Sequence, residues 1–349
     1  MKRNQTKPIK IGRIGIGGDY PVTIQSMLNT KNGDVEAALS QSLRLKEAGC
    51  DIIRLAVTDE DSIRVVEALK KQIDIPLVAD IQFDYKIAIR AMEAGIDKIR
   101  LNPGNIGSDD KVKSVVSVAA ERNIPIRVGV NSGSVSFDIA EKYGRYSAEG
   151  LVEEAMRHIR ILEDCHYDNI VVSLKASEVM TMIESYRLMS ERRNYPLHLG
   201  VTEAGTSFAG TVKSAVGIGT LLAEGIGDTI RVSLTDDPVE EIRAAKEILK
   251  ALSLRTSGAK LVSCPTCSRC SIDLISIANE VEKRLEKIQK DIKVAVMGCV
   301  VNGPGEAKGA DIGITGSNGE GLIFKGGKVI RRVPEEKIVD ELFQEIDKL

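Results

Sequence analysis

Short runs of apolar and β-branched residues recur along the first two thirds of the chain, and a segment with helical periodicity follows each one. Eight such runs are present, namely VTIQSML, DIIRLAV, IPLVADI, DKIRLN, IPIRVGV, NIVVSL, LHLGVTE and DTIRVSL. The segments between them, such as DVEAALSQSLRLKEAG and AEGLVEEAMRHIRILEDC, have acidic residues near their start and one apolar stripe, as amphipathic helices do. Eight strand and helix repeats in about 250 residues predict an α/β fold, a closed (β/α)8 TIM barrel.

An open, doubly wound α/β sheet is the structural alternative to this barrel. That fold carries a glycine fingerprint in its first strand-to-helix turn. GRIGIGG near residue 12 precedes the first predicted strand, and GIGTLLAEG near residue 217 comes late in the repeats, so neither segment has the required place. The first segment is instead predicted to form an N-terminal hairpin that closes the floor of the barrel.

The pattern changes after the last barrel helix, which is predicted from about Pro238 to Ala251 with Asp237 as its cap. A polar linker follows at about 252–260. At 349 residues the chain exceeds the ~250 to 300 residues at which a single hydrophobic core stops growing. We therefore expect a barrel over residues 1–254 and a separate small α+β domain over residues 260–349.

Within the small domain, the pattern predicts a strand that leads into SCPTCSRC, a helix from Ser271 to about Ile288, and a strand over DIKVAVMG. A glycine-rich loop, VVNGPGEAKGADIG, a hairpin around GLIFKGGKVI and a charged terminal helix complete the domain. The cysteine motif is thus expected at the end of a strand.

Charge and composition limit the classes of function. The net charge is −2 and aromatic residues make up 3% of the chain, too few to provide stacking platforms for nucleic acid. No apolar run approaches the ~20 residues that span a bilayer, so we expect a cytoplasmic protein without membrane contact. In a reducing compartment, clustered cysteines bind metal or do chemistry rather than form disulfides. His158 and His166 are expected to flank a helix end and His198 lies in a strand, so a histidine-rich metal site is not expected.

The polar residues at the carboxyl ends of the predicted strands are mostly cationic, and active sites of TIM barrels form at these ends. Like charges around one cavity repel unless an anion lies between them, and the arginine guanidinium suits phosphate oxygens. We predict a small, multiply anionic ligand, most simply a diphosphate. The carboxyl group of Glu203 is predicted to donate a proton, with acceptance of a hydrogen bond from a substrate hydroxyl as its alternative role. The residues at these ends are Arg54, Arg100 with Asn102, Arg127 with Asn131, Lys175, and Arg231 with Ser233, together with the carboxylates Asp80 and Glu203.

The small domain contains Cys264, Cys267 and Cys270 in SCPTCSRC, and Cys299 further downstream. Four thiolates on zinc are one interpretation, although zinc ribbons normally use two separated CxxC pairs. Four thiolates on an iron-sulfur cluster, forming an electron carrier, are the second. In the third, Glu306 of CVVNGPGE is a weak carboxylate ligand, whose displacement opens one iron to a substrate oxygen and makes the cluster a catalyst.

These segments resemble, along essentially the whole chain, the bacterial two-domain 4-hydroxy-3-methylbut-2-enyl diphosphate synthases of the methylerythritol phosphate route to isoprenoids. The matching stretches are PVTIQSMLNT, VADIQFDYKIAI, KIRLNPGNIG, RVGVNSGS, VSLKAS, LHLGVTEAGT, DTIRVSLT, SCPTCSRC and GCVVNGPGEA. The resemblance implies a [4Fe-4S] cluster held by Cys264, Cys267, Cys299 and Glu306. It also implies that the cations at the strand ends and Ser233 bind the diphosphate of 2-C-methyl-D-erythritol 2,4-cyclodiphosphate, with Asn102 and Asn131 beside them and Asp80 and Glu203 near its hydroxylated carbon chain.

Two positions depart from the family pattern. Gln82 stands where the family commonly has histidine, so an amide must serve there in place of an imidazole. Cys270 stands where the family usually lacks cysteine, and this extra thiol is either free or a competitor for the cluster.

The reaction that the resemblance implies is reductive ring opening and dehydroxylation to (E)-4-hydroxy-3-methylbut-2-enyl diphosphate, by an iron-sulfur oxidoreductase. Flavodoxin or ferredoxin is the implied electron donor, since no flavin or nicotinamide fingerprint is visible. The last barrel helix ends at the floor, and a linker of roughly nine residues at ~3.5 Å each reaches at most ~30 Å. We therefore predict a homodimer with sites formed in trans, as the resemblance also implies.

Two rival functions are compatible with the same residues. One is a phosphate-binding barrel of the pterin-synthase type with a zinc-stapled domain, which shares the barrel architecture only. The other is a non-catalytic iron-sulfur electron carrier with a ligand-sensing barrel. Zinc without acid-labile sulfide would favour the first, and a cluster without turnover would favour the second.

Overall fold

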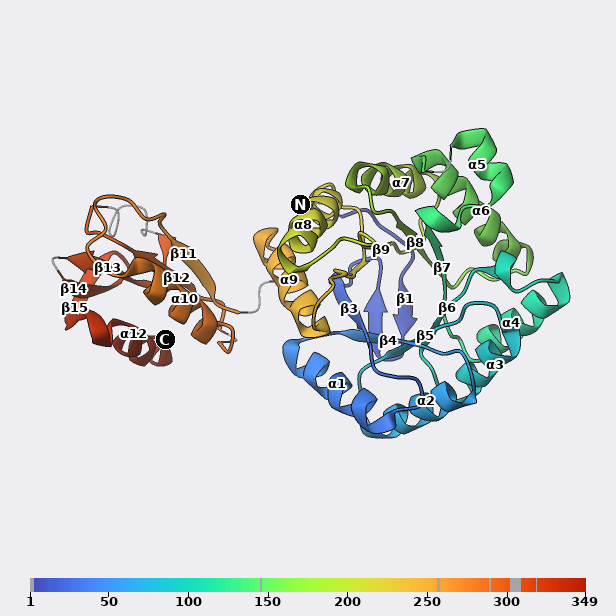
Figure 1. Cartoon of the computed structure of the whole chain (residues 1–349), viewed down its shortest axis with the longest axis horizontal. Coiled ribbons are helices and arrows are strands. Elements are labelled where there is room, and N and C mark those ends of the chain that lie inside the picture. Colours follow the sequence, from blue (N-terminus) through green and yellow to red (C-terminus); the bar gives the residue numbers. More distant parts are fainter. Residues whose placement is uncertain (1–2, 145, 256–257, 289, 302–308, 318) are drawn as a thin grey trace. The chain divides into compact units, whose positions relative to one another are not determined.

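The computed structural model describes residues 3–144, 146–255, 258–288, 290–301, 309–317 and 319–349. The chain divides into two compact units, Met1–Arg255 and Thr256–Leu349 (Figure 1). Each unit has its own sheet and its own hydrophobic core, and each is described by itself.

The first unit is built around an eight-stranded parallel sheet with the order β8-β7-β6-β5-β4-β3-β10-β9. A parallel bridge between Val172 of β8 and Leu197, just before β9, joins the two ends of the sheet into a nearly closed barrel. Each of the eight predicted runs forms one of these strands, which confirms the predicted TIM barrel. The strands are β3 (Thr23–Met27), β4 (Ile52–Ala56), β5 (Leu77–Asp80), β6 (Lys98–Arg100), β7 (Ile126–Asn131), β8 (Ile170–Lys175), β9 (His198–Leu199) and β10 (Thr229–Ile230).

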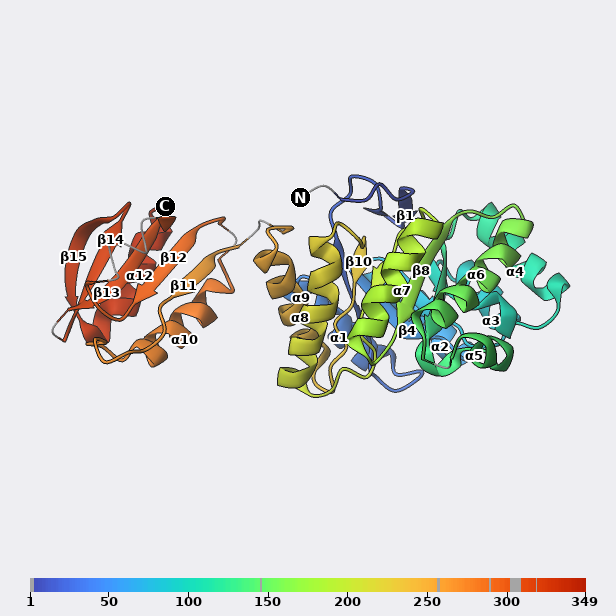
Figure 2. The same cartoon turned by 90° about the horizontal axis from the view of Figure 1, so that it is seen from above.

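Helices follow the strands and surround the barrel (Figures 1 and 2). The first, α1 (Val35–Ala48), begins after Asp34, whose side chain accepts a backbone N–H of the first turn, and ends at Gly49 with a φ of 95°. The last, α9 (Pro238–Ala251), has the predicted bounds and the predicted cap, Asp237. The others are α2 (Glu60–Gln72), α3 (Tyr85–Glu93), α4 (Asp109–Glu121), α6 (Ala148–Asp164), α7 (Val179–Arg192) and α8 (Ser207–Ala223).

The N-terminal hairpin closes the floor of the barrel. Its strands, β1 (Ile9–Ile11) and β2 (Ile14–Ile16), pair antiparallel, as the opening segment of the sequence predicts. Three hairpin isoleucines pack against residues at the amino ends of three barrel strands, in a buried cluster of Ile9, Ile11, Ile16, Ile52, Val78 and Val171. The hairpin therefore covers this end of the barrel with apolar side chains.

Two features of the first unit differ from the sequence-based expectations. A further short helix, α5 (Phe137–Tyr143), lies between β7 and α6. His158 lies inside α6 and is buried, rather than at a helix end, because the apolar stripe of α6 continues past it to Leu162. The short 3-10 turn η1 (Pro103–Asn105) is separated from β6 by two residues, and η2 (Ser132–Ser134) directly follows β7.

The second unit contains a five-stranded mixed sheet with the order β11-β12-β13-β14-β15. Helices α10 and α12 contribute buried leucines and isoleucines to its core. Over the described residues of both units, no helix has the length and apolar character needed to cross a bilayer. The elements are β11 (Lys260–Ser263), α10 (Leu274–Leu285), β12 (Lys293–Met297), β13 (Ile312–Ser317), β14 (Glu320–Lys325), β15 (Lys328–Pro334) and α12 (Ile338–Asp347).

The middle strand of this sheet, β13, was not predicted, because its glycine-rich sequence indicates a loop. The glycine allows close packing instead: a Cβ on Gly313 would lie 2.4 Å from the Phe324 ring and 2.6 Å from the Ala295 carbonyl oxygen. Helix α10 is also shorter than predicted, because Asp273 accepts the Ser276 N–H and caps its first turn.

Candidate functional site

A polar cavity of about 180 Å³ lies among the carboxyl ends of the barrel strands. All five cations predicted at these ends line it. The structure thus brings together every predicted substrate-binding residue except Asp80 and Asn102. The lining residues are Arg54, Arg100, Arg127, Gly129, Asn131, Ser173, Lys175, Thr202, Arg231 and Ser233.

Strand register explains why these side chains meet. Neighbouring strands of a barrel place residues at matched heights side by side, and alternate residues face the interior. β5 and β6 pair Asp80 with Arg100, and β6 and β7 pair Arg100 with Arg127. β7 and β8 then pair Asn131 with Lys175. Polar residues that are far apart in the sequence therefore share one cavity.

Asp80 is the counter-ion of two of these arginines. It accepts a hydrogen bond from Arg54 Nη2, and its Oδ1 lies 3.4 Å from Arg100 Nη1. Burial opposes ionisation, but attraction to Arg54 and Arg100 lowers the pKa of Asp80 below its usual value. One ionised carboxylate offsets part of the positive charge, and the cavity as a whole stays cationic.

Lys175 and Arg127 are buried in the cavity wall beside other cations. Burial, followed by repulsion from Arg231 and Arg127, lowers the pKa of Lys175 well below its usual value. Burial and the neighbouring Arg54 lower the pKa of Arg127 in the same way. Among the described residues, Nε and Nη1 of Arg127 have no hydrogen-bond partner. An anion in the cavity would relieve the repulsion between these groups.

Arg231 is held by a residue that the sequence analysis missed, Glu241 of α9. Glu241 Oε1 lies 3.4 Å from Arg231 Nη2 and accepts the Leu234 N–H at 3.1 Å, and Glu241 Oε2 accepts the Ser26 hydroxyl at 2.8 Å. Acidic residues are common in the first turn of any helix, so the sequence gives no special signal for Glu241. Its burial against the arginine shows that it orients the cavity wall.

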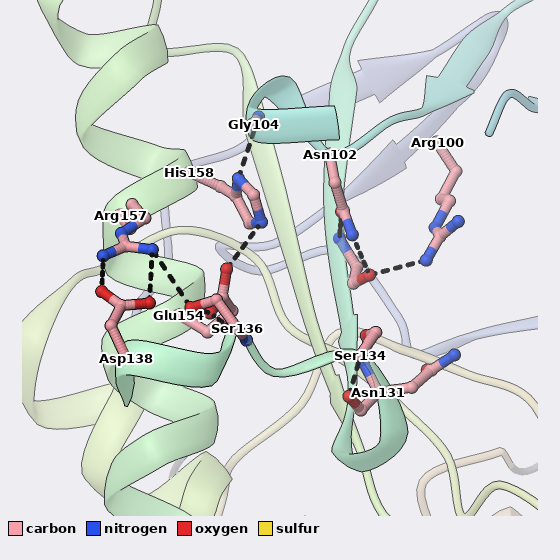
Figure 3. Close-up of polar contacts among 11 residues, drawn as sticks. Arg100, Asn102, Gly104, Asn131, Ser134, Ser136, Asp138, Glu154, Arg157 and His158 are labelled. Atoms are coloured by element: carbon pink, nitrogen blue, oxygen red, sulfur yellow. Dashed lines mark hydrogen bonds and ion pairs between the residues drawn. The ribbon is translucent and has the colours of Figure 1, made fainter. Parts of the chain in front are cut away.

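Asn102 acts on the cavity through Gly129 rather than by lining it. Asn102 Nδ2 donates to the Gly129 carbonyl oxygen at 3.0 Å, and the Gly129 N–H donates to Asn102 Oδ1 at 2.9 Å. Arg100 Nη2 donates to the same carbonyl oxygen at 2.7 Å (Figure 3). A Cβ on Gly129 would lie 2.9 Å from Arg100 Nε, so glycine makes room for the arginine. A direct contact of Asn102 with a ligand stays a prediction.

Glu203, the predicted proton donor, follows β9 and is exposed. It does not line the cavity, whereas its neighbour Thr202 does. Its φ of 54° lies in the left-handed region, which is uncommon for glutamate and occurs preferentially at functional sites. Its role in proton transfer stays a prediction.

Three further lining residues, Gly129, Ser173 and Thr202, were not predicted. Gly129 and Ser173 stand two residues from Arg127 and Lys175, so the period-two alternation of inward positions is the signal that would have found them. Thr202 follows the short strand β9 and has no such signal.

The predicted metal ligands of the second unit follow β11 and β12. These parallel neighbours pair Ser263 with Val296, so Cys264 and Cys299, which follow them, lie at the same edge of the sheet. Cys299 is buried and Cys267 is exposed. Among the residues that the structure describes, no three Cys, His, Asp or Glu side chains are close enough together to hold a metal ion. Glu306, the predicted fourth ligand, lies outside the described residues.

The local environment of these cysteines nevertheless fits thiolate ligands. The Gly298 N–H donates to Cys264 Sγ at 3.2 Å, the kind of hydrogen bond that supports a metal-bound sulfur. A hydrogen bond from the Arg269 backbone lowers the pKa of Cys267, which favours its thiolate. Cys270 Sγ instead donates to the Ile272 carbonyl oxygen at 3.2 Å. That Cys270 is not a ligand stays a prediction.

Two protein-family models together match nearly all of the sequence. The model of the GcpE TIM-barrel domain matches residues 6–246, and the model of the GcpE protein C-terminal domain matches residues 260–348. The chain belongs to the GcpE family. Membership of the GcpE family accounts for the barrel and for the cysteine-containing unit, and it confirms the resemblance drawn from the sequence.

Two relatives of this GcpE-family chain have the same name. This chain is 58% identical over 349 residues to the 4-hydroxy-3-methylbut-2-en-1-yl diphosphate synthase (flavodoxin) of Ruminiclostridium cellulolyticum. The alignment covers 100% of this chain and 99% of the relative. The protein of the same name from Clostridium acetobutylicum is 58% identical over 349 residues, covering 100% of both chains.

A solved structure resembles the barrel of this GcpE-family chain alone. Dihydropteroate synthase from Xanthomonas albilineans, in complex with 7,8-dihydropteroate, aligns with a TM-score of 0.51 and 15% identity over 71% of this chain and 98% of that chain. At this identity the likeness shows the shared barrel fold and no shared activity.

Proposed function

We propose that this chain catalyses the reductive ring opening and dehydroxylation of 2-C-methyl-D-erythritol 2,4-cyclodiphosphate to (E)-4-hydroxy-3-methylbut-2-enyl diphosphate. The observation that carries the proposal is the cavity of about 180 Å³ that five cations line. A ligand with two phosphate groups matches that charge and the forked geometry of the arginines. The names of the relatives at 58% identity support the same activity.

The cations contribute most at the bond that breaks. When the bond between C2 and its phosphate oxygen breaks, negative charge grows on the diphosphate. Donors fixed in advance around that position stabilise the growing charge without reorganising. Asp80 keeps Arg54 and Arg100 in place, and Glu241 does the same for Arg231.

The C3 hydroxyl must leave as water, which requires a proton. We assign this proton to Glu203, beside the lining residue Thr202. Replacing Glu203 by Gln should therefore lower kcat more than it raises KM, whereas a pure binding role would raise KM alone.

The reaction also consumes two electrons, and we propose that Cys264, Cys267, Cys299 and Glu306 hold a [4Fe-4S] cluster. Such a cluster, when bound, transfers electrons one at a time and offers a Lewis-acidic iron. Flavodoxin, which appears in the names of the relatives, is the proposed donor, with ferredoxin as the alternative. Anaerobic purification should yield about four irons and four sulfides per chain, and zinc without sulfide would contradict the cluster.

We further propose a homodimer whose sites combine the barrel of one subunit with the second unit of its partner. Arg255, at the end of the barrel unit, is tied to Asp51 just before β4, at 3.1 Å, so the chain leaves the barrel at the floor. Helix α8 also exposes an apolar face suited to a partner, with Phe208, Val212 and Val216 at helical spacing. Coexpressed Arg54 and Glu306 variants should partly restore activity in mixed dimers, and no recovery would contradict sites formed in trans.

The rival functions are not favoured. The pterin-synthase alternative has only the 15% identical barrel behind it. An electron carrier with a ligand-sensing barrel would also bind an anion in this cavity, but the relatives at 58% identity are named as synthases. The direct test of the proposal is turnover of the cyclic diphosphate with reduced flavodoxin, detected as linear product.

A further inference from the structure

Two buried polar residues of α6, Glu154 and His158, tie together the loops that follow β6 and β7. They are four residues apart on one face of the helix, and each is 4% exposed. Neither lines the cavity. Buried carboxylates and imidazoles are unfavourable without partners, so their contacts show what they hold.

His158 uses both of its ring nitrogens. The Gly104 N–H donates to His158 Nδ1 at 3.1 Å, so Nδ1 carries no hydrogen in this arrangement (Figure 3). His158 Nε2 therefore carries the hydrogen, and it lies 3.3 Å from Glu154 Oε1. A Cβ on Gly104 would lie 2.6 Å from His158 Cε1, so glycine permits this close approach.

Glu154 holds the second loop. Its Oε2 accepts the Ser136 backbone N–H at 2.9 Å and the Ser136 hydroxyl at 2.5 Å. Arg157, one turn further along α6, donates to the same hydroxyl at 3.1 Å and pairs with Asp138 of α5 (Figure 3). Both carboxylate oxygens of Glu154 are thus engaged, one toward each loop.

These loops continue directly into the cavity wall. Gly104 is two residues beyond Asn102, whose amide clamps Gly129, and Gly129 in turn accepts from Arg100. Ser136 follows the lining residue Asn131 on the other loop. A shift of either loop would therefore move groups that face the ligand.

We propose that His158 and Glu154 are positioning residues for the cyclic diphosphate, which act by fixing the loops after β6 and β7; this inference rests on the proposed function. The imidazole supplies one acceptor and one donor on opposite sides. Glutamine has the same pair in its amide, with an oxygen to accept the Gly104 N–H and an NH2 to donate to Glu154. Leucine has neither.

The test compares His158→Leu with His158→Gln in the cluster-loaded enzyme. With reduced flavodoxin, the Leu variant should raise KM for the cyclic diphosphate about tenfold and change kcat by less than about threefold, because loosened loops weaken ligand binding. The Gln variant should restore KM to within about threefold of the wild type. His166→Asn is the control, since His166 is exposed just past α6 and asparagine tolerates its φ of 55°.

A second measurement does not need turnover. Amide hydrogen exchange over residues 102–107 should be about tenfold faster in His158→Leu and unchanged in His158→Gln. If the wild type fails to convert the cyclic diphosphate, the proposed function is wrong. The exchange data still test whether His158 fixes the loop after β6. If His158→Leu does not fold, Ser136→Ala replaces it, with an expected rise in KM of about threefold. Wild-type KM and exchange in His158→Leu, or a Gln variant as poor as Leu, would overturn the proposal.

Discussion

The floor and the carboxyl end of the barrel are built from opposite kinds of residue. At the floor, hairpin isoleucines pack in a buried apolar cluster against residues near the starts of three strands. At the carboxyl end, five cations surround one cavity, and two of them, Lys175 and Arg127, are buried beside like charges. The apolar end thus contributes stability, whereas the buried like charges at the other end lower it, as expected for a site that is proposed to bind an anion. Substitutions at the two ends should therefore separate stability from activity.

The largest effect is expected from Arg127→Met at the carboxyl end. This change removes a buried cation whose Nε and Nη1 have no partner among the described residues. We expect kcat/KM for the cyclic diphosphate to fall at least ~100-fold, about 3 kcal/mol, because the proposed site loses one of the charges assigned to the diphosphate. The melting temperature should not fall, since removal of a buried charge that repels Arg54 and Arg100 offsets the loss of its attraction to Asp80. Steady-state kinetics measure kcat/KM, and thermal denaturation measures the melting temperature. A variant with the kcat/KM of the wild type would contradict a role of Arg127 in the site.

Ile16→Ala at the floor should lower stability and leave activity nearly unchanged. Ile16 is fully buried in the hairpin cluster, so the truncation should lower the free energy of unfolding of the barrel by about 3 kcal/mol. At 25 °C kcat/KM should stay within about twofold of the wild type. Urea denaturation followed by circular dichroism measures the first quantity. Ile330→Ala, at an exposed position of β15, is the matched control and should change stability by less than about 0.5 kcal/mol. A folded Ile16→Ala enzyme without activity would contradict the assignment of stability to the floor and of activity to the carboxyl end.

Lys175→Met should show, through the pH dependence of stability, that the buried Lys175 charge is unfavourable. The pKa of Lys175 is lower in the folded protein than in the unfolded chain, where it is ~10.4. Between the two values the unfolded chain binds more protons, so the stability that depends on Lys175 rises with pH. The variant should be more stable than the wild type at neutral pH, and this advantage should shrink as the pH approaches 10. Chemical denaturation of both proteins across this range measures the difference, and a constant difference would contradict the account.

The smallest effect is expected in the second unit, from Cys270→Ser. Cys270 Sγ already bonds to a carbonyl oxygen, so iron and sulfide content and turnover should stay within about twofold of the wild type. Cys264→Ser, the matched change at a proposed ligand, should lose the cluster. If the two variants behaved alike, the set of four cysteines would replace the proposed set with Glu306.

The barrel and the cation-lined cavity were both predictable from the sequence, for one physical reason. Parallel strands buried on both faces appear as short apolar runs, and the polar residue that ends each run must lie where the carboxyl ends meet. The pattern of apolar runs is therefore enough to place Arg100 and Lys175 at one cavity, whereas Arg54 stands in the middle of β4 and reaches the same cavity from there.

The contacts that orient these residues were not predictable in the same way. The clamp between Asn102 and Gly129 depends on side-chain geometry across two strands. Glu241 looks like any acidic residue in a first helical turn, and β13 looks like a loop because of its glycines. Glu306 lies outside the described residues, so its role as a ligand remains a prediction.

The measurement that tests the central claim most directly is anaerobic turnover of 2-C-methyl-D-erythritol 2,4-cyclodiphosphate by the cluster-loaded enzyme, with reduced flavodoxin as the donor. Phosphorus NMR separates the cyclic diphosphate from the linear product. We predict one linear diphosphate for each pair of electrons consumed, and loss of this conversion in Arg127→Met. A fully loaded enzyme that neither binds nor converts the cyclic diphosphate would contradict the account.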